Sequence, residues 1–177
     1  MNSREKAEKM KIGIITDTHE QVPVIQWAVN LFNNEKIDLF IHLGDIISPI
    51  MSGHFRPLEA EKVYIYGNND GEKNWLEKKF TTIYEPPYIF ERNSLVFYCT
   101  HVPEAKWETV IEKYDPDFVL FGHTHQMYFE KRDKIVFFNP GESCGLLFGQ
   151  FQLGLIDTDQ KIVMIKDMNG REIKHTY

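Results

Sequence analysis

The chain has 177 residues, of which 42% are apolar and 14% aromatic, enough to bury the core of one α/β or α+β domain. Its formal charge is −6, from 26 acidic and 20 basic residues, and no basic block occurs beyond scattered lysines near the start. A broad basic face for nucleic acid is therefore not expected. An acidic protein can still bind anions where bound divalent cations reverse the local field, which directs attention to metal-ligand residues.

Cysteine content and the start of the chain predict the cellular setting. Two cysteines, Cys99 and Cys144, do not make the dense disulfide framework of a small secreted protein. The charged start does not resemble a signal peptide, and no apolar run reaches about 18 residues. We interpret residues 1–10 as a polar N-terminal tail, residues 11–177 as a single domain, and the protein as soluble and cytoplasmic, with no membrane partner.

The first part of the chain alternates between strand and helix patterns. Short β-branched runs indicate strands, and Val22, Ile25 and Val29 show the spacing of a helix. In chain order we predict a strand at 11–15, a helix at 22–32, a strand at 38–43, a weak helix at 50–60 interrupted by Pro57, and a strand at 63–66. Two such crossovers imply neighbouring parallel strands.

The second part becomes richer in hairpins after the break at Pro86-Pro87. We predict a helix at 72–80, a hairpin at 88–100 that turns at Asn93-Ser94, a helix at 104–114, a strand at 117–121, paired strands at 127–131 and 135–138, and paired strands at 150–156 and 161–166. The sequence contains no internal repeat and no interdomain linker.

Side chains of the types that bind metals follow five of the predicted strands. They are Asp17 and His19, then Asp45, then Asn68, then His101, and finally His123 and His125. Because the carboxyl ends of strands in an open α/β sheet are where sites form, we expect these side chains to converge. Gly44, Gly67 and Gly122 would let the backbone turn tightly beside them.

Two pairs of these residues are separated by one position. An extended segment would point Asp17 and His19 the same way, and would do the same for His123 and His125. Carboxylate and imidazole without thiolate suit Mn²⁺, Fe²⁺, Zn²⁺ or Ni²⁺. Each motif alone also has an ordinary interpretation as a turn or a surface histidine. Their joint order at successive strand ends favours a metal site.

The motifs Asp17-x-His19, Gly44-Asp45, Gly67-Asn68-x-Asp70, His101 and Gly122-His123-x-His125 together resemble the calcineurin-like metallophosphoesterase superfamily. The short length and residues 67–72 and 139–142 resemble its small bacterial and archaeal phosphodiesterases, which are related to the retromer scaffold subunit. The resemblance spans residues 11–157. It implies an α/β fold, a four-layer α/β/β/α sandwich with two mixed β-sheets flanked by helices.

The resemblance also implies a ligand set. It assigns Asp17, His19 and His125 to one ion, Asn68, His101 and His123 to a second, and Asp45 to both. Two divalent ions are therefore expected as cofactors, with Mn²⁺ favoured and Ni²⁺, Fe²⁺, Zn²⁺ or Mg²⁺ as alternatives. A hydroxide held between the ions would attack phosphorus.

Asn69 departs from the superfamily pattern. Many members carry a histidine there that binds phosphate and can protonate the leaving group. An amide can donate a hydrogen bond but not a proton at neutral pH. We place Asn69 and Asp70 among the catalytic residues, with a structural role as the alternative for Asp70, and expect substrates with good leaving groups or modest turnover. Val102, where glycine often occurs, is a second departure.

Three further residues have ordinary interpretations. His42 lies within a predicted strand and is interpreted as a hydrogen-bonded buried histidine rather than a ligand. His54 is the best candidate for a substitute acid, although a solvated helix histidine is the ordinary interpretation. Cys144 could line the rim of the site without a part in the mechanism.

The leading hypothesis is a two-metal phosphodiesterase that acts on a small phosphodiester. The alternative is a weakly active or inactive protein-binding scaffold of the same fold, and seven polar residues gathered at one buried point argue against it. A metal-dependent nuclease is disfavoured by the acidic charge. Pairing of exposed sheet edges into a homodimer is left open.

Overall fold

The structure is a computed structural model that describes residues 9–177. Its elements are β1 (Lys11–Ile15), α1 (Val22–Glu35), β2 (Leu39–His42), the 3₁₀ turn η1 (Pro49–Met51), α2 (Ser52–Phe55), β3 (Glu61–Ile65), α3 (Lys73–Lys79), β4 (Ile83–Tyr84), β5 (Tyr88–Arg92), β6 (Leu95–Cys99), α4 (Trp107–Tyr114), β7 (Phe118–Leu120), β8 (Met127–Arg132), β9 (Ile135–Pro140), β10 (Gln152–Asp157), β11 (Ile162–Asp167) and β12 (Glu172–Thr176).

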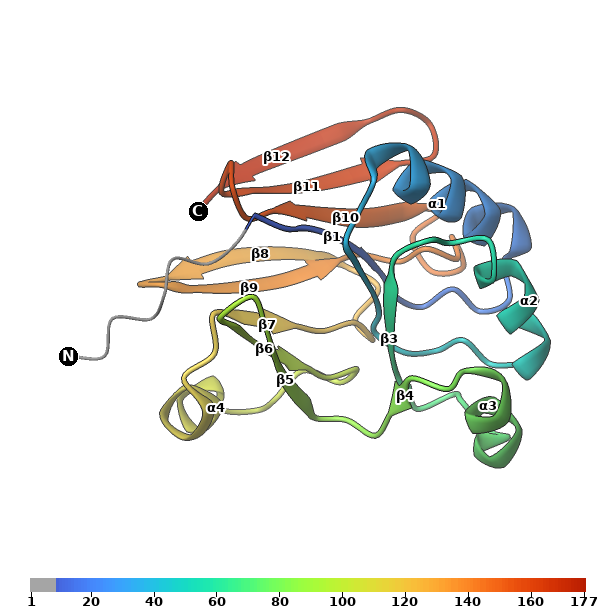
Figure 1. Cartoon of the computed structure of the whole chain (residues 1–177), viewed down its shortest axis with the longest axis horizontal. Helices are drawn as coiled ribbons and strands as arrows, with labels where there is room; N and C mark the ends of the chain where they lie inside the picture. Colours follow the sequence, from blue (N-terminus) through green and yellow to red (C-terminus); the bar gives the residue numbers. More distant parts are fainter. Residues whose placement is uncertain (1–8) are drawn as a thin grey trace.

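The strands form two mixed sheets (Figure 1). The larger has the order β12-β11-β10-β1-β2-β3-β4, in which β1 to β4 are parallel and β10 to β12 are joined to β1 and to one another by antiparallel pairing. The smaller has the order β5-β6-β7-β9-β8, with parallel pairs in the middle and antiparallel pairs at both edges.

Three apolar cores separate four layers. Ile14 and Ile41 meet Phe138 between the two sheets. Helices α1 to α3 cover the outer face of the larger sheet, and α4 covers the smaller one through Val110 (Figure 1). The predicted α/β/β/α sandwich is confirmed.

Helix α1 shows how local sequence specifies these layers. Its buried side chains run from Val24 to Phe32 at helical spacing and pack in the outer core of the larger sheet. A proline in its first turn needs no intrahelical partner for its nitrogen. The helix continues beyond the predicted end at residue 32 and stops at Lys36, whose φ of 54° places it in the left-handed region.

Several predicted elements differ in extent. The weak helix at 50–60 is only η1 and α2, which ends at Phe55, because Pro57 lacks the N–H that would continue it. The helix expected from residue 104 begins at Trp107. Strands β4 and β12 were missed: β4 has two residues, and β12 alternates only between exposed and half-buried side chains.

The expected tail lies mostly outside the described residues, which exclude 1–8. Met10, assigned to that tail, is instead buried, and its backbone N–H and C=O both bond to Thr158. Within residues 9–177 none of the helices has the length and apolar content to cross a bilayer.

Candidate metal centre

The loops after β1, β2, β3, β6 and β7 carry the predicted ligands, and backbone hydrogen bonds join these loops. The Asp17 N–H donates to the Gly44 carbonyl at 3.0 Å, and the Gly122 N–H donates to the His101 carbonyl at 3.0 Å. Because β1, β2 and β3 run parallel, their carboxyl ends meet at one edge. Residues remote in the sequence are therefore brought together there.

Asp17, His19 and His125 form the first group. One ligand atom from each lies within 4.8 Å of the others. Asp17 Oδ1 is 3.4 Å from His125 Nε2, and the rings of His19 and His125 stack with centroids 5.4 Å apart. These are the residues that the resemblance assigns to one ion.

Asp45 lies between the two groups. Its Oδ2 is 3.4 Å from His19 Nε2 and also 3.4 Å from His101 Nε2. Burial raises the pKa of this carboxyl, but His101 and the Asn69 N–H groups outweigh it and hold the pKa below its usual range. The side chain is thus an anion placed between two histidines that the resemblance assigns to different ions.

Asn68, His101 and His123 form the second group. Asn68 Oδ1 is 2.8 Å from His123 Nδ1 and 3.0 Å from His101 Nε2. The three side chains thus direct one oxygen and two nitrogens at a common point. All seven predicted ligand residues are brought together at this edge of the sandwich.

Two buried polar atoms of the first group lack partners. Asp17 Oδ1 and His19 Nε2 have no hydrogen bond within residues 9–177. An unsatisfied buried polar atom costs about 1–3 kcal/mol. These two atoms are an oxygen and a nitrogen with no hydrogen-bond partner, and the ionised carboxylate of Asp45 lies beside them. Such a set of atoms fits a divalent cation.

The predicted ligand residues do not have the extended backbone that was expected of them. Asp17, His19, Asp45, His123 and His125 have φ values of 52°, 40°, 60°, 65° and 57°. The paired ligands therefore converge through left-handed turns and not through strand alternation. A left-handed residue costs about 1–2 kcal/mol, so the surrounding fold holds these loops in a strained arrangement.

Hydrogen bonds fix the orientation of two histidines. His101 Nδ1–H donates to the Leu43 carbonyl at 2.7 Å, and His125 Nδ1–H donates to Glu142 Oε2 at 2.8 Å. Each bond places a proton on Nδ1 and turns Nε2 toward the centre. Both rings therefore have the orientation that ligands of an ion at this centre would need.

Glu142 is a functional candidate that the sequence analysis missed. Its carboxylate is fully buried and also accepts N–H groups from Leu147, Phe148 and Gln150. Burial raises its pKa, but His125 and these N–H groups outweigh it and hold the pKa low. The only sequence signal was the motif at residues 139–142.

The two predicted catalytic residues both contact the Asp45 region. Asn69 donates its backbone N–H to Asp45 Oδ1 at 2.9 Å and its amide to Oδ2 at 2.7 Å. The buried Asp70 carboxylate accepts the backbone N–H groups of Asp45, Ile47 and Gly67 at 3.1, 2.6 and 2.7 Å. Asp70 thus joins two ligand loops, which favours the structural alternative over a catalytic role.

His42 is a buried, hydrogen-bonded histidine, as predicted. Its Nδ1 accepts the Gly44 N–H at 3.2 Å, so Nε2 carries the proton and bonds to Thr18 Oγ1 at 3.0 Å. Burial lowers its pKa to about 3. His54 is half-buried on α2, and its role as an acid stays a prediction.

Cys144 lies beside the centre without being a good ligand. Its Sγ is 3.9 Å from His125 Nδ1 and 3.8 Å from Glu142 Oε2. Burial raises the pKa of the thiol to about 11, so it stays protonated. The Glu142 carboxylate already accepts four N–H groups, one of them from His125. Glu142 therefore supports His125, and the two residues do not form another metal site with Cys144.

The sandwich and the strand-end cluster define the class of protein. The chain belongs to the calcineurin-like phosphoesterase superfamily, whose domain model matches residues 10–161. Among its relatives, phosphodiesterase MJ0936 of Methanocaldococcus jannaschii is 39% identical over 158 residues, which are 86% of this chain and 95% of that protein.

Solved structures agree with this assignment. A structure described as a novel archaeal phosphodiesterase superposes with a TM-score of 0.79 at 36% identity and covers 94% of this chain and 100% of that one. Vacuolar protein sorting 29 from Cryptosporidium parvum has a TM-score of 0.71 at 14% identity, with 94% and 96% of the two chains covered. At that identity the second likeness concerns the fold alone.

Proposed function

We propose that this phosphoesterase is a phosphodiesterase that uses two divalent metal ions, with Mn²⁺ as the favoured ion. The observation that carries the proposal is the position of Asp45 Oδ2, 3.4 Å from one histidine of each group. Asp17, His19 and His125 would hold one ion, Asn68, His101 and His123 the other, and Asp45 both. Two bound ions would supply positive charge for the phosphoryl oxygens and lower the pKa of a water.

The residues of the chain supply positioning. His101 and His125 present fixed Nε2 atoms, because Leu43 and Glu142 hold their Nδ1 protons. Asp70 fixes the spacing of the Asp45 and Asn68 loops. The side chains that would hold the ions therefore need little rearrangement during a reaction at a phosphoryl group. Such preorganisation is what electrostatic catalysis requires.

Asn69 limits the range of substrates. Its amide donates to Asp45 and has no proton that it can release to a leaving group at neutral pH. Phosphodiesters with stable leaving groups should therefore be cleaved faster than those that need a proton. The −6 charge favours small diesters over nucleic acid.

The proposal is tested by hydrolysis of bis-nitrophenyl phosphate beside nitrophenyl phosphate. Protein treated with chelator is assayed alone and after reloading with Mn²⁺, Ni²⁺, Zn²⁺ or Mg²⁺. We expect metal to restore diester cleavage in the native chain but not in Asp45→Asn. The matched control is Asp133→Asn, an exposed turn position with a φ of 52° that asparagine tolerates.

The scaffold alternative makes the opposite prediction. A protein that binds two ions per chain and cleaves neither ester with any metal would contradict the enzyme proposal. Equal activity of Asp45→Asn and the native chain would contradict the assignment of the site.

A further inference from the structure

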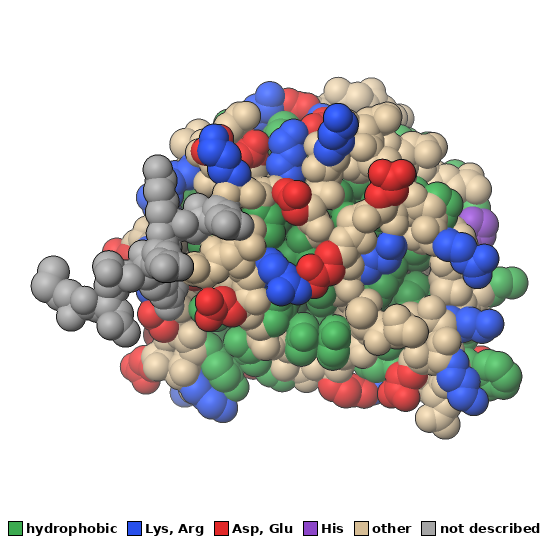
Figure 2. All heavy atoms as spheres, in the orientation of Figure 1, with side chains coloured by type: hydrophobic (Ala, Val, Ile, Leu, Met, Phe, Trp, Pro, Cys, Tyr) green, Lys and Arg blue, Asp and Glu red, His purple; other side chains and the backbone are tan. Residues whose placement is uncertain are grey.

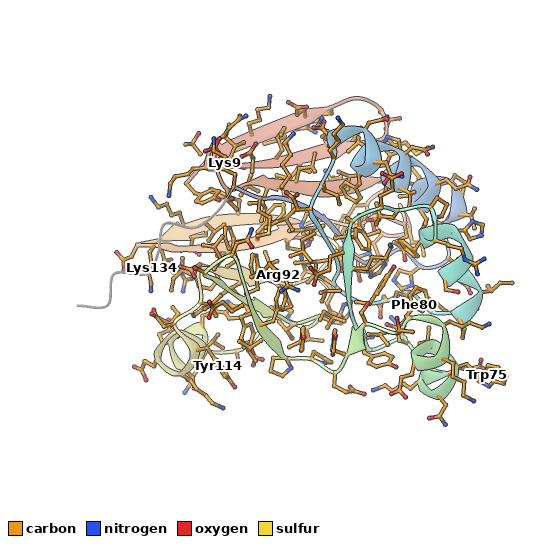
Figure 3. The ribbon with its side chains drawn as sticks, in the orientation of Figure 1. Lys9, Trp75, Phe80, Arg92, Tyr114 and Lys134 are labelled. Carbon is orange, nitrogen blue, oxygen red and sulfur yellow. The ribbon has the colours of Figure 1, made fainter. Side chains whose placement is uncertain are left out.

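A pocket of about 410 Å³ lies between α2, α3 and the start of β3. Phe80, labelled in Figure 3, lines it at the end of α3. None of the seven predicted metal ligands lines it. Its volume is within the range of small-molecule sites.

The lining of this pocket is strongly biased in charge. Arg56, Lys62, Lys78 and Lys79 line it, and no aspartate or glutamate does, although the chain has more acidic than basic residues. Within residues 9–177, none of the four has a carboxylate partner, whereas Lys73 pairs with Glu85. Figure 2 shows Lys and Arg side chains along the edge that α2 and α3 form, on the right.

The floor of the pocket contains an unused donor. Tyr64 on β3 is only 3% exposed, and its hydroxyl has no hydrogen bond to any described residue. Lys62, two positions earlier on the same face, is half-buried and bonds only to backbone carbonyls, at Leu58 and Ala60. Burial of the ammonium lowers its pKa, a cost that a bound anion would offset.

We propose that this pocket binds the phosphate group of a small phosphorylated molecule. The four cations are opposite in sign to a phosphate monoester, which carries a charge of about −2 at pH 7, and the hydroxyls of Tyr64, Thr81 and Thr82 add neutral donors. The volume exceeds that of phosphate alone and leaves room for an organic group. A single pocket of this size lies at one corner of the fold and does not track a polymer backbone, which disfavours nucleic acid as the ligand.

The test is a titration of Mg²⁺-loaded protein with inorganic phosphate and, separately, with adenosine monophosphate, followed residue by residue through amide NMR. We expect saturable shifts at residues 52–56 and 78–82. Tighter binding of the nucleotide would show that the organic group contributes, and equal binding would show that phosphate alone is recognised. Saturation confined to the metal ligands would overturn the proposal.

Three variants separate a built site from general charge. Arg56→Gln with Lys79→Gln should weaken binding about tenfold, equivalent to about 1.4 kcal/mol. Tyr64→Phe, which preserves packing and charge, should weaken it by a smaller factor. Lys106→Gln with Lys131→Gln removes the same charge from exposed positions elsewhere and should leave affinity unchanged. Equal weakening by both double variants would overturn the proposal.

Discussion

Single residues of the candidate site differ in how far the sequence could predict them. Asp17, Asp45 and His101 follow predicted strands, so their convergence was predictable from the topology. The role of Glu142 was not predictable, because it depends on which histidine the loop after β9 contacts in the folded chain. The left-handed backbone at Asp17 also has no signal in the residue types alone.

Glu142→Gln tests the support of His125. The amide keeps the shape and one acceptor but removes the charge that makes the imidazole a stronger ligand. Loss of such a partner typically lowers metal affinity or activity about 10–100-fold. Calorimetric titration of chelated protein with Mn²⁺ measures this, and Glu112→Gln on the exposed face of α4 is the control. Unchanged affinity would show that Glu142 only braces its loop.

His42 makes stability depend on pH. Its pKa is lowered to about 3 by burial from an ordinary value of 6.5, so between these values only the unfolded chain binds the proton. The contribution of His42 to the free energy of unfolding is therefore constant above about pH 6.5, and it falls as the pH decreases below that value. We expect metal-free native protein to lose about 2 kcal/mol more than His42→Gln between pH 7.5 and 5, measured by urea unfolding. Parallel curves for the two proteins would contradict this.

Among the elements, the loop between β3 and α3 offers a matched pair of glycines. A Cβ on Gly67 would collide with the backbone and carboxylate of Asp45, whereas a Cβ on Gly71 would meet nothing within 4 Å. Gly67→Ala should therefore displace Asp45, reduce metal binding and cost about 1–3 kcal/mol of stability. Gly71→Ala should change neither quantity. Metal titration and urea unfolding of both variants test this, and retention of both properties by Gly67→Ala would contradict the packing.

Turns and long helices were predicted better than edge strands. The Asn93-Ser94 turn is confirmed, and both residues have positive φ, at 51° and 61°, as a two-residue hairpin requires. Within residues 9–177, strand β12 pairs only with β11 and has no fully buried residue, so its sequence lacks a core pattern. Whether such a segment forms a strand depends on its pairing with another strand and not on its own sequence pattern.

At the scale of the whole molecule, composition indicated one α/β or α+β domain, but the four layers came from the family resemblance. Periodicity locates strands without showing that β10 pairs with β1 across 136 intervening residues or that two sheets face each other. Both features depend on contacts remote in sequence. At the strand-end centre itself, the buried carboxylates of Asp17 and Asp45 would repel an anionic substrate unless bound cations reversed the local field.

The central claim is that one carboxylate joins two metal sites. Anomalous diffraction from crystals of the Mn²⁺-loaded protein tests it most directly. We predict two peaks about 3.5–4 Å apart, with Asp45 bound to both. A single peak, or two peaks that do not share Asp45, would contradict the account.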